Sequence, residues 1–212
     1  MILVIDTALN ACQAGLYRDG EALMTRTEAM TRGHQEALGP MLEALLRDAK
    51  AEPRDLAAIG VTLGPGSFTG LRVGLSFAKG VAAGLNRPLQ GVGTLEALLR
   101  HPGLDGENAL AVIDGGRGRF YVQSAGRAAQ SLDADGLIAL ARDAAVATLT
   151  GPAAPAAGHL TGLGVFAQDW PSLDAIAELT AAGGHDDLTP LYMREADAVA
   201  SRRGIISLSD AG

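Results

Sequence analysis

The most informative feature of this chain is a glycine-rich stretch, Gly64–Gly74, which reads Gly-Pro-Gly-Ser-Phe-Thr-Gly-Leu-Arg-Val-Gly. An apolar run precedes it over residues 56–63, and a longer one follows over residues 71–85. This order predicts a buried strand, a tight turn and a helix, because glycine permits positive φ and close backbone approach. Ser67 is the expected N-cap of that helix.

Two interpretations of this loop compete, because amides at a helix N-terminus can face either an anion or another backbone. The loop sequence matches the known nucleotide-binding motifs poorly. A Walker loop ends in Gly-Lys-Ser/Thr, whereas the first lysine after this loop is Lys79. The loop therefore either holds a phosphate, through Gly66 and Ser67, or is a structural turn that starts an interface helix.

The helix after the loop carries a stripe of small residues. Every fourth position is small, at Gly66, Gly70, Gly74, Ala78 and Ala82, so these residues share one side of the helix. The other positions are mostly large and apolar, which is typical of a helix buried on more than one side. We expect either a central core helix in a monomer or a helix that packs against its own sheet and against a partner.

Composition excludes several classes of function. The chain has 212 residues and a formal net charge of −7, so it is a poor nucleic-acid binder without a partner that supplies basic surface. The single cysteine excludes an intrachain disulfide, and the N-terminus has neither a basic region nor a long apolar one. No stretch suits a membrane span. We expect a cytoplasmic protein.

The order of predicted elements indicates an α/β protein built from two related domains. Residues 1–92 read strand-strand-strand-helix-strand-helix-strand, and a weaker copy of this pattern starts at residue 109. Each half opens with an apolar strand that ends in an aspartate, Asp6 and Asp114. We therefore predict domains at residues 1–100 and 101–212, the second reduced.

Three local predictions can be compared directly with a structure. A helix with Leu38, Met41 and Leu45 on one face should start after Thr31 as its N-cap, and Pro40 should delay or kink it. The segment 151–164 is rich in Gly, Pro and Ala and reads as a loop, whereas residues 172–182 read as a helix.

Several short segments, in order along the chain, match one known family. They are Ile5–Thr7, Ala11-Cys12, His34 with Met41-Leu42, Gly64–Gly74, Ala78–Gly80, Gly91-Val92 with Thr94–Ala97, Ile113-Asp114 with Gly118, and Tyr192–Arg194. Together they resemble the TsaB (YeaZ) family of bacterial tRNA threonylcarbamoyladenosine biosynthesis proteins. Residues 125–190 contribute little to this resemblance.

The resemblance implies the actin-like ATPase fold and a role as a non-catalytic subunit. In that family the subunit binds and activates the catalytic paralogue TsaD through a helix-bundle interface, beside the ATPase TsaE, and pairs with itself when alone. The complex transfers a threonylcarbamoyl group to N6 of an adenosine in certain tRNAs. The resemblance therefore implies no intrinsic cofactor, ATP or ADP only in the complex, and tRNA contact only through partners.

The partner interface expected from this resemblance and from the small-residue stripe lies on the first two helices. It consists of His34, Leu38, Met41, Leu45, Gly70, Arg72, Gly74, Phe77, Ala78 and Val81. For His34 a capping role is the alternative, and for Arg72 a solvated position.

Two residues of this chain support a non-catalytic role, because they replace the histidines of a His-x-x-x-His metal motif that the catalytic relatives carry. Here Thr94 and Leu98 occupy those two positions, and leucine cannot ligate a metal. We predict no catalytic residue and no metal site. Arg119 also stands where the family usually has a glutamate, so no role is carried over for that position.

The rival hypothesis is a nucleotide-binding ATPase or small-molecule kinase of the same fold. It would place ATP and Mg²⁺ among Asp6, Gly66, Ser67 and Asp114, because the two aspartates correspond to phosphate-facing positions in active members of the fold. The structural alternative is that Asp6 caps a turn and holds the cleft closed.

Overall fold

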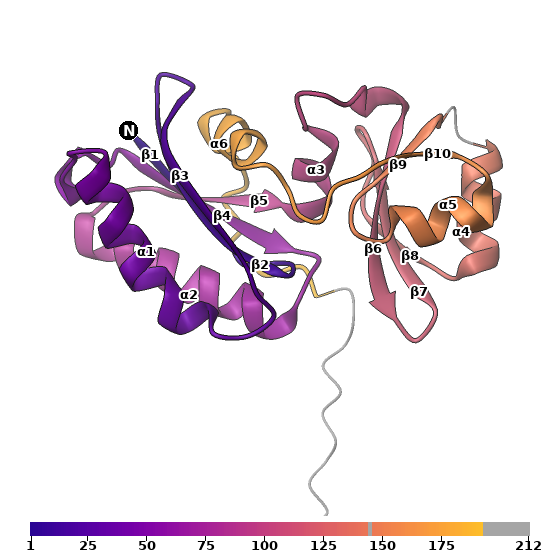
Figure 1. Cartoon of the computed structure of the whole chain (residues 1–212), viewed down its shortest axis with the longest axis horizontal. Coiled ribbons are helices and arrows are strands. Elements are labelled where there is room, and N and C mark those ends of the chain that lie inside the picture. The colour runs from indigo at the N-terminus through magenta and orange to yellow at the C-terminus, as the bar shows by residue number, and fades with distance from the viewer. Residues whose placement is uncertain (144–145, 193–212) are drawn as a thin grey trace, which may run out of the picture.

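The computed structural model describes residues 1–143 and 146–192, which form two five-stranded sheets flanked by helices (Figure 1). The first half contains β1 (Ile2–Asp6), β2 (Ala11–Arg18), β3 (Glu21–Ala29), α1 (His34–Asp48), β4 (Ala58–Gly64), α2 (Phe68–Leu85), β5 (Leu89–Gly93) and α3 (Thr94–Leu99). A short 3-10 helix, Pro53–Asp55, precedes β4.

The second half repeats this order with mostly shorter elements. It contains a 3-10 helix (Gly106–Asn108), β6 (Ala109–Gly116), β7 (Arg119–Ser124), β8 (Gln130–Leu132), α4 (Ala134–Asp143), β9 (Thr148–Thr150), α5 (Ala154–Thr161), β10 (Gly164–Phe166) and α6 (Leu173–Ala181).

The two sheets have the same topology. Their strand orders are β3-β2-β1-β4-β5 and, written in the matching direction, β8-β7-β6-β9-β10. In each sheet the first three strands pair antiparallel, and the first and fourth strands pair parallel. The prediction of two related α/β units, the second reduced, is therefore confirmed.

Each sheet is covered on one side by a helix that follows the last strand of the other. Helix α3 follows β5 but packs its leucines against β6 and β7, whereas α6 follows β10 and packs on β1, β4 and β5. Figure 1 shows α6 on the face of the first sheet opposite α1 and α2. The segment 173–181 thus lies on the first sheet although it comes late in the sequence. The domain boundary at residue 100 stays a prediction.

Strand β2 is buried on both faces because helices lie on both sides of its sheet. Cys12, Ala14 and Leu16 pack in the cluster beneath α1 and α2, and Tyr17 packs with α6 on the other face. Tyr17 also donates a hydrogen bond from its hydroxyl to Asp174 of α6 at 2.7 Å. A strand buried in this way reads as a continuous apolar run rather than an alternating one.

The local predictions have mixed outcomes. Ser67 is the N-cap of α2, and its hydroxyl accepts from the Gly70 N–H at 3.2 Å, as predicted. Thr31 is not the cap of α1: Gly33 is, with φ of 89° and no side-chain hydrogen bond. The helix starts at His34 and runs through Pro40. The prediction of a loop over residues 151–164 is wrong, because Ala154–Thr161 within this segment form the helix α5.

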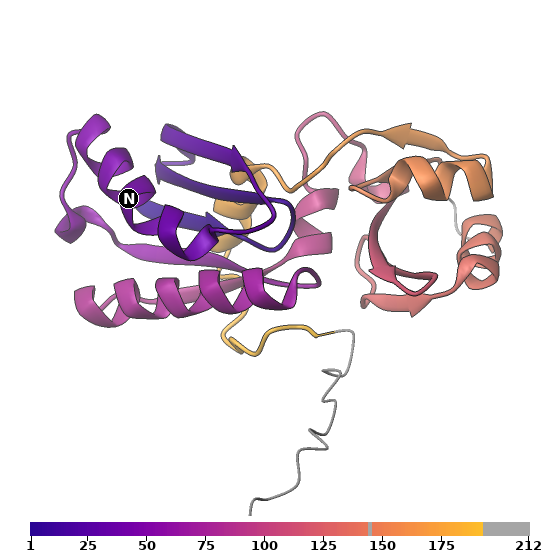
Figure 2. The same ribbon diagram turned by 60° about the horizontal axis from the view of Figure 1, so that its bottom comes forward.

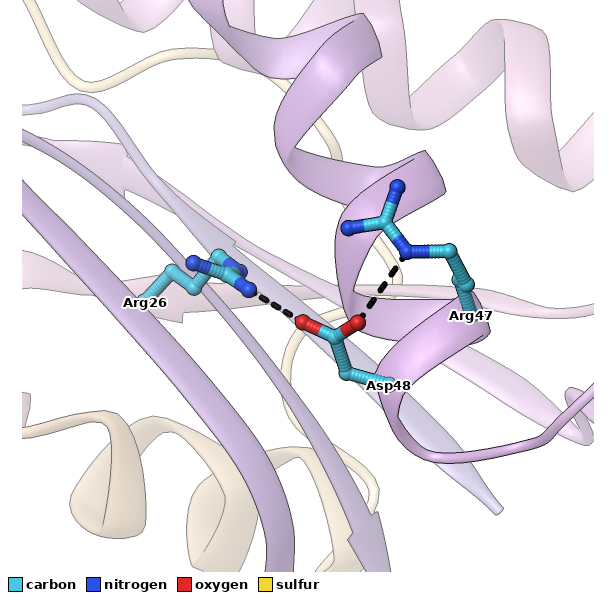
Figure 3. A network of polar contacts seen from close by, with 3 residues as sticks. All are labelled: Arg26, Arg47 and Asp48. Carbon is cyan, nitrogen blue, oxygen red and sulfur yellow. Dashed lines mark hydrogen bonds and ion pairs between the residues drawn. The ribbon is translucent and has the colours of Figure 1, made fainter.

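Charged side chains connect the C-terminal end of α1 to the edge strand β3. Asp48 accepts hydrogen bonds from Arg47, at 3.1 Å, and from Arg26 on β3 (Figure 3). The hydrogen bond from Arg47, with that from Arg26, lowers the pKa of Asp48 below its ordinary value. Because this network is exposed to solvent, we assign it an orienting role rather than a large share of the stability.

Candidate functional site

Asp6, at the carboxyl end of β1, is enclosed by donors from three parts of the chain. Its Oδ1 accepts from the Ala8 N–H at 3.0 Å and from the Thr62 hydroxyl at 2.7 Å. Its Oδ2 accepts from the Gln13 side-chain amide at 2.8 Å. The residue has no exposed surface, and burial raises the pKa of its carboxyl above the ordinary value. These bonds fasten β1, β2, β4 and the β1–β2 turn to one another.

The hydrogen bonds of Asp6 continue into the connection between the two sheets. The Gln13 amide also donates to the carbonyl of Pro171 at 3.1 Å, and the Thr27 hydroxyl donates to Gln13 Oε1 at 3.1 Å. Pro171 lies just before α6, so Asp6 acts through Gln13 on the segment that returns from the second sheet. Asp6 therefore caps the β1–β2 turn, which is one part of the alternative to phosphate contact named above. Its part in holding a cleft closed stays a prediction.

Asp114, the equivalent residue of the second sheet, has different surroundings. It is exposed, and its carboxylate accepts from the Gly116 N–H at 2.6 Å within the β6–β7 hairpin. Arg119 in the same hairpin donates to the Ser131 backbone carbonyl and hydroxyl of β8, and its guanidinium lies 3.8 Å from the Asp133 carboxylate. The residue that departs from the family pattern therefore fastens β7 to the neighbouring edge strand.

The glycine-rich loop packs against the chain's own backbone. The Ser67 N–H donates to the Ala8 carbonyl at 2.7 Å. A Cβ placed on Gly66 would lie 2.2 Å from that same oxygen, one on Gly70 would lie 2.1 Å from the Thr7 carbonyl oxygen, and one on Gly74 would lie 2.3 Å from the Thr7 hydroxyl. Of the two interpretations of the loop amides, the structure thus shows contact with another backbone.

The small-residue stripe therefore packs against the chain's own residues, and it does not by itself require a partner helix. Ala78 has no exposed surface, and Ala82 is also buried in the core. A bulky side chain at Gly74 or a charge at Ala78 would disturb the fold before it reached a partner.

The residues expected at a partner interface fall into two groups. Seven are buried within the chain itself: His34, Leu38, Met41, Leu45, Gly70, Gly74 and Ala78. Three reach the surface: Arg72 is exposed, and Phe77 and Val81 are half-buried. The seven pack within the first half of the chain, and the second group reaches the surface. The use of either group by a partner stays a prediction.

An open groove of about 550 Å³ lies beside these surface residues, between the first turn of α1 and the first three turns of α2. Phe68 is its most exposed large hydrophobic side chain at 44%. The Arg72 guanidinium lies 4.5 Å from the centre of the Phe68 ring, a cation–π contact, and the ring of Tyr192 lies 4.9 Å from it. The groove is lined by Gln35, Leu38, Phe68, Thr69, Arg72, Val73, Ser76 and Phe77.

The sequence prediction missed most of this groove. Thr69, Val73 and Ser76 recur at helical spacing beside the small-residue stripe, and this periodicity was the available signal. Tyr192 belongs to a segment that carries the family resemblance, although Met193 and Arg194 of that segment lie outside the described residues.

Thr94 and Leu98, which replace the histidines of the catalytic relatives' metal motif, lie inside the protein. Thr94 and Leu98 on α3 have no exposed surface, and the Thr94 hydroxyl has no hydrogen-bond partner. Over residues 1–143 and 146–192 no group of three or more His, Cys, Asp or Glu side chains is placed to hold a metal ion. His34 is 7% exposed, and its Nε2 is buried without a hydrogen-bond partner.

Helices in the described part of the chain are too short or too polar to cross a membrane.

Comparison with known proteins identifies the family. Residues 26–175 match the family described as "TsaD: tRNA N6-adenosine threonylcarbamoyltransferase". The chain belongs to this family. An uncharacterised protein of Mycobacterium tuberculosis is 36% identical over 205 residues, a match that covers 93% of each chain.

Relatives named TsaB and YeaZ confirm the resemblance seen in the sequence. The tRNA threonylcarbamoyladenosine biosynthesis protein TsaB of Escherichia coli is 36% identical over 124 residues, which cover 57% of this chain and 52% of that protein. A solved Pseudomonas aeruginosa protein with similarity to peptidase YeaZ superposes with a TM-score of 0.75 at 25% identity, covering 91% of this chain and 99% of that one. The α/β, actin-like fold class is likewise confirmed.

Substitution of Gly70 by alanine should destabilise the protein. The new Cβ would meet the Thr7 carbonyl oxygen, so α2 must move away from the β1–β2 turn, and we expect a loss of about 1–3 kcal/mol in the free energy of unfolding. Gly80→Ala on the same helix is the matched control, because its Cβ would have no neighbour within 4 Å. That control should be neutral or stabilising by up to about 1 kcal/mol. Urea denaturation measures both, and equal effects would contradict the packing role of the stripe.

The two equivalent aspartates should differ in their contribution to stability. Asp6→Ala leaves buried donors of Ala8, Gln13 and Thr62 without their acceptor and should cost roughly 2–5 kcal/mol. Asp114→Ala removes one exposed acceptor and should cost less than about 1 kcal/mol. Thermal and urea denaturation of both variants test this. A fully stable Asp6→Ala protein would contradict the structural role of Asp6.

Proposed function

We propose that this chain is a non-catalytic subunit in tRNA threonylcarbamoyladenosine biosynthesis, which binds and activates a TsaD-family catalytic subunit. The coarser part, a role in this biosynthesis, rests on the relatives named TsaB. The finer part rests chiefly on one observation, the groove between α1 and α2 with its exposed Phe68, Arg72 and half-buried Phe77.

The chemistry of this groove suits a helical protein partner. Apolar and aromatic side chains supply the contact area, and interface hot spots are rich in tyrosine and arginine beside such side chains. The partner face should therefore be an apolar helix that carries a carboxylate for Arg72. The homodimer expected for the isolated chain would use the same face, so the catalytic subunit and a second copy would compete for it.

The remaining roles are assigned to the complex. The buried Thr94 and Leu98, at the positions of the catalytic relatives' metal motif, support a non-catalytic subunit. The net charge of −7 supports indirect contact with tRNA, through basic partner surface. We propose that TsaE joins this complex, that ATP or ADP binds only within it, and that the complex works in the cytoplasm.

The rival function, an ATPase or small-molecule kinase, has weaker support. It requires Asp6, Gly66, Ser67 and Asp114 to surround a nucleotide. Asp6 is enclosed by its own hydrogen bonds, and the Ser67 amide is bonded to Ala8, so neither group offers a free contact in this conformation.

A bulky charge in the groove should weaken the complex. Ser76→Arg places a long cation at an exposed lining position, and we expect the Kd for the purified TsaD-family subunit to rise at least about 30-fold, or ~2 kcal/mol. Ala156→Arg on α5 is the matched control, because it introduces the same side chain at an exposed position of the second half. Isothermal titration calorimetry measures both. Tight binding by Ser76→Arg would place the interface elsewhere.

The isolated chain should neither bind nor hydrolyse ATP. With 5 mM ATP and Mg²⁺, about fivefold above the upper end of ordinary KM values, we expect no phosphate release above a buffer control. A coupled phosphate assay and calorimetric titration test this. Turnover that disappears in Asp114→Ala would instead support the kinase-like function.

A further inference from the structure

Another open cavity, separate from the α1–α2 groove, lies between the first sheet and the connection that leads from β10 to α6. Its volume is about 420 Å³, and side chains of β2 and β3 line it together with residues 168–174. Figure 2 shows this connection, in orange, running from the second half of the chain to α6. The hydrogen bonds from Gln13 to Pro171 and from Tyr17 to Asp174 join the two walls, so the cavity is a formed part of the fold.

The wall of this cavity is negatively charged. Asp169 and Asp174 both line it and are exposed, and neither forms an ion pair with another described residue. Among the described lining residues there is no lysine or arginine. His101 adds no positive charge, because its Nδ1 accepts from the Gly103 N–H at 3.0 Å and so carries no proton. The cavity therefore disfavours phosphates and carboxylates and favours a cation.

The two carboxylates differ in how far the fold explains them. Asp174 lies in the first turn of α6, where a negative charge is favourable, and its Oδ1 accepts from the Tyr17 hydroxyl. Asp169 makes no hydrogen bond or ion pair with its side chain to any described residue. Its position on the cavity wall is thus without a structural partner within the described chain.

Gln168 provides an observation that does not depend on charge. Its side chain is 8% exposed, and its Nε2 donates to the Leu98 carbonyl at 3.0 Å and to the Thr150 hydroxyl at 2.6 Å. These two bonds fix the amide, yet its Oε1 is buried and has no donor. Buried side-chain oxygens of this kind are nearly always paired. Because Gln168 lines the cavity, a molecule bound there can supply the missing N–H.

Aromatic side chains complete the wall. Trp170, the only tryptophan of the chain, is half-buried, and Tyr17 of β2 is 2% exposed. Indole and phenol rings attract organic cations through their negative faces. The volume also falls within the range of about 300–1,000 Å³ that is typical of small-molecule sites.

We propose that this cavity binds a small organic cation with N–H groups, an alkyl amine or a guanidinium compound. The carboxylates of Asp169 and Asp174 supply the opposite charge, Gln168 accepts an N–H, and Trp170 contacts the carbon chain. Such a ligand touches both walls and therefore stabilises the connection to α6 against the first sheet. This inference does not rest on the proposed function, because it uses no residue of the α1–α2 groove.

Fluorescence titration of the full chain tests the site, because Trp170 is the only indole that can respond. The probes are putrescine and agmatine, with 1,4-butanediol as the uncharged counterpart of putrescine and tetramethylammonium as a cation without N–H groups. We expect a saturable change in emission with a Kd below about 1 mM for both amines, weakened by added salt. The diol should give no response, and tetramethylammonium should bind more weakly.

Variants locate the ligand. Asp169→Asn removes one charge, and Asp174→Asn removes the other while keeping an oxygen acceptor for Tyr17. Each should raise the Kd of putrescine about 2–5-fold, the range of an exposed charge pair, and the double variant should raise it further. Asp186→Asn is the matched control, because this exposed carboxylate follows His185, which is bonded to β5 at the opposite edge of the sheet from β3. Thermal denaturation checks that all three variants are folded.

Several outcomes would overturn the proposal. No saturable change in emission up to about 10 mM of either amine, ten times the expected Kd, would show that the site holds water alone. An equal response to the diol would remove the need for a cation. Binding seen by calorimetry that leaves Trp170 emission unchanged, or that Asp186→Asn weakens as much as Asp169→Asn, would place the cation elsewhere on the acidic surface. Equal affinity for tetramethylammonium would contradict the contact with Gln168.

Discussion

The close approach of α2 to the β1–β2 turn is the constraint on which the rest of the first half depends. Gly66 and Gly70 bring this helix against the backbone of Ala8 and Thr7, and Gly74 brings it against the Thr7 side chain, so a Cβ at any of the three would clash. The Thr7 hydroxyl donates to the Gly70 carbonyl at 2.8 Å, so the contact is directional as well as close. The position of α2 then fixes α1 beside it, and together they form the groove.

The sequence predicted much of the fold and little of the site. The strand, turn and helix around Ser67 followed from local chemistry, because glycine spacing and an N-cap act over a few residues. The three-residue strands β8 and β10 were missed, since so short a run carries almost no periodic signal. The small-residue stripe showed that something approaches α2 closely. It did not show what, because Thr7 and Ala8 reach the helix only through the folding of the sheet.

The two sheets have the same topology, but equivalent residues have different structural roles in them. Asp6 is buried under three donors and joins strands of the first sheet, whereas Asp114 is exposed and serves one hairpin. A pattern shared by both halves predicts common topology well. It predicts a common role for each matching residue poorly, because the second half leaves its aspartate in solvent.

The exchange of α3 and α6 between the sheets makes the two halves depend on each other for folding. Without α6, the face of the first sheet that carries Val4 and Tyr17 would be open to water, and without α3 the face with Ala111 and Ile113 would be. Neither copy of the duplicated unit is thus a complete folding unit. This mutual covering makes the folding of the two halves cooperative, and a nascent chain can bury the second face of its first sheet only after the second sheet has been synthesised.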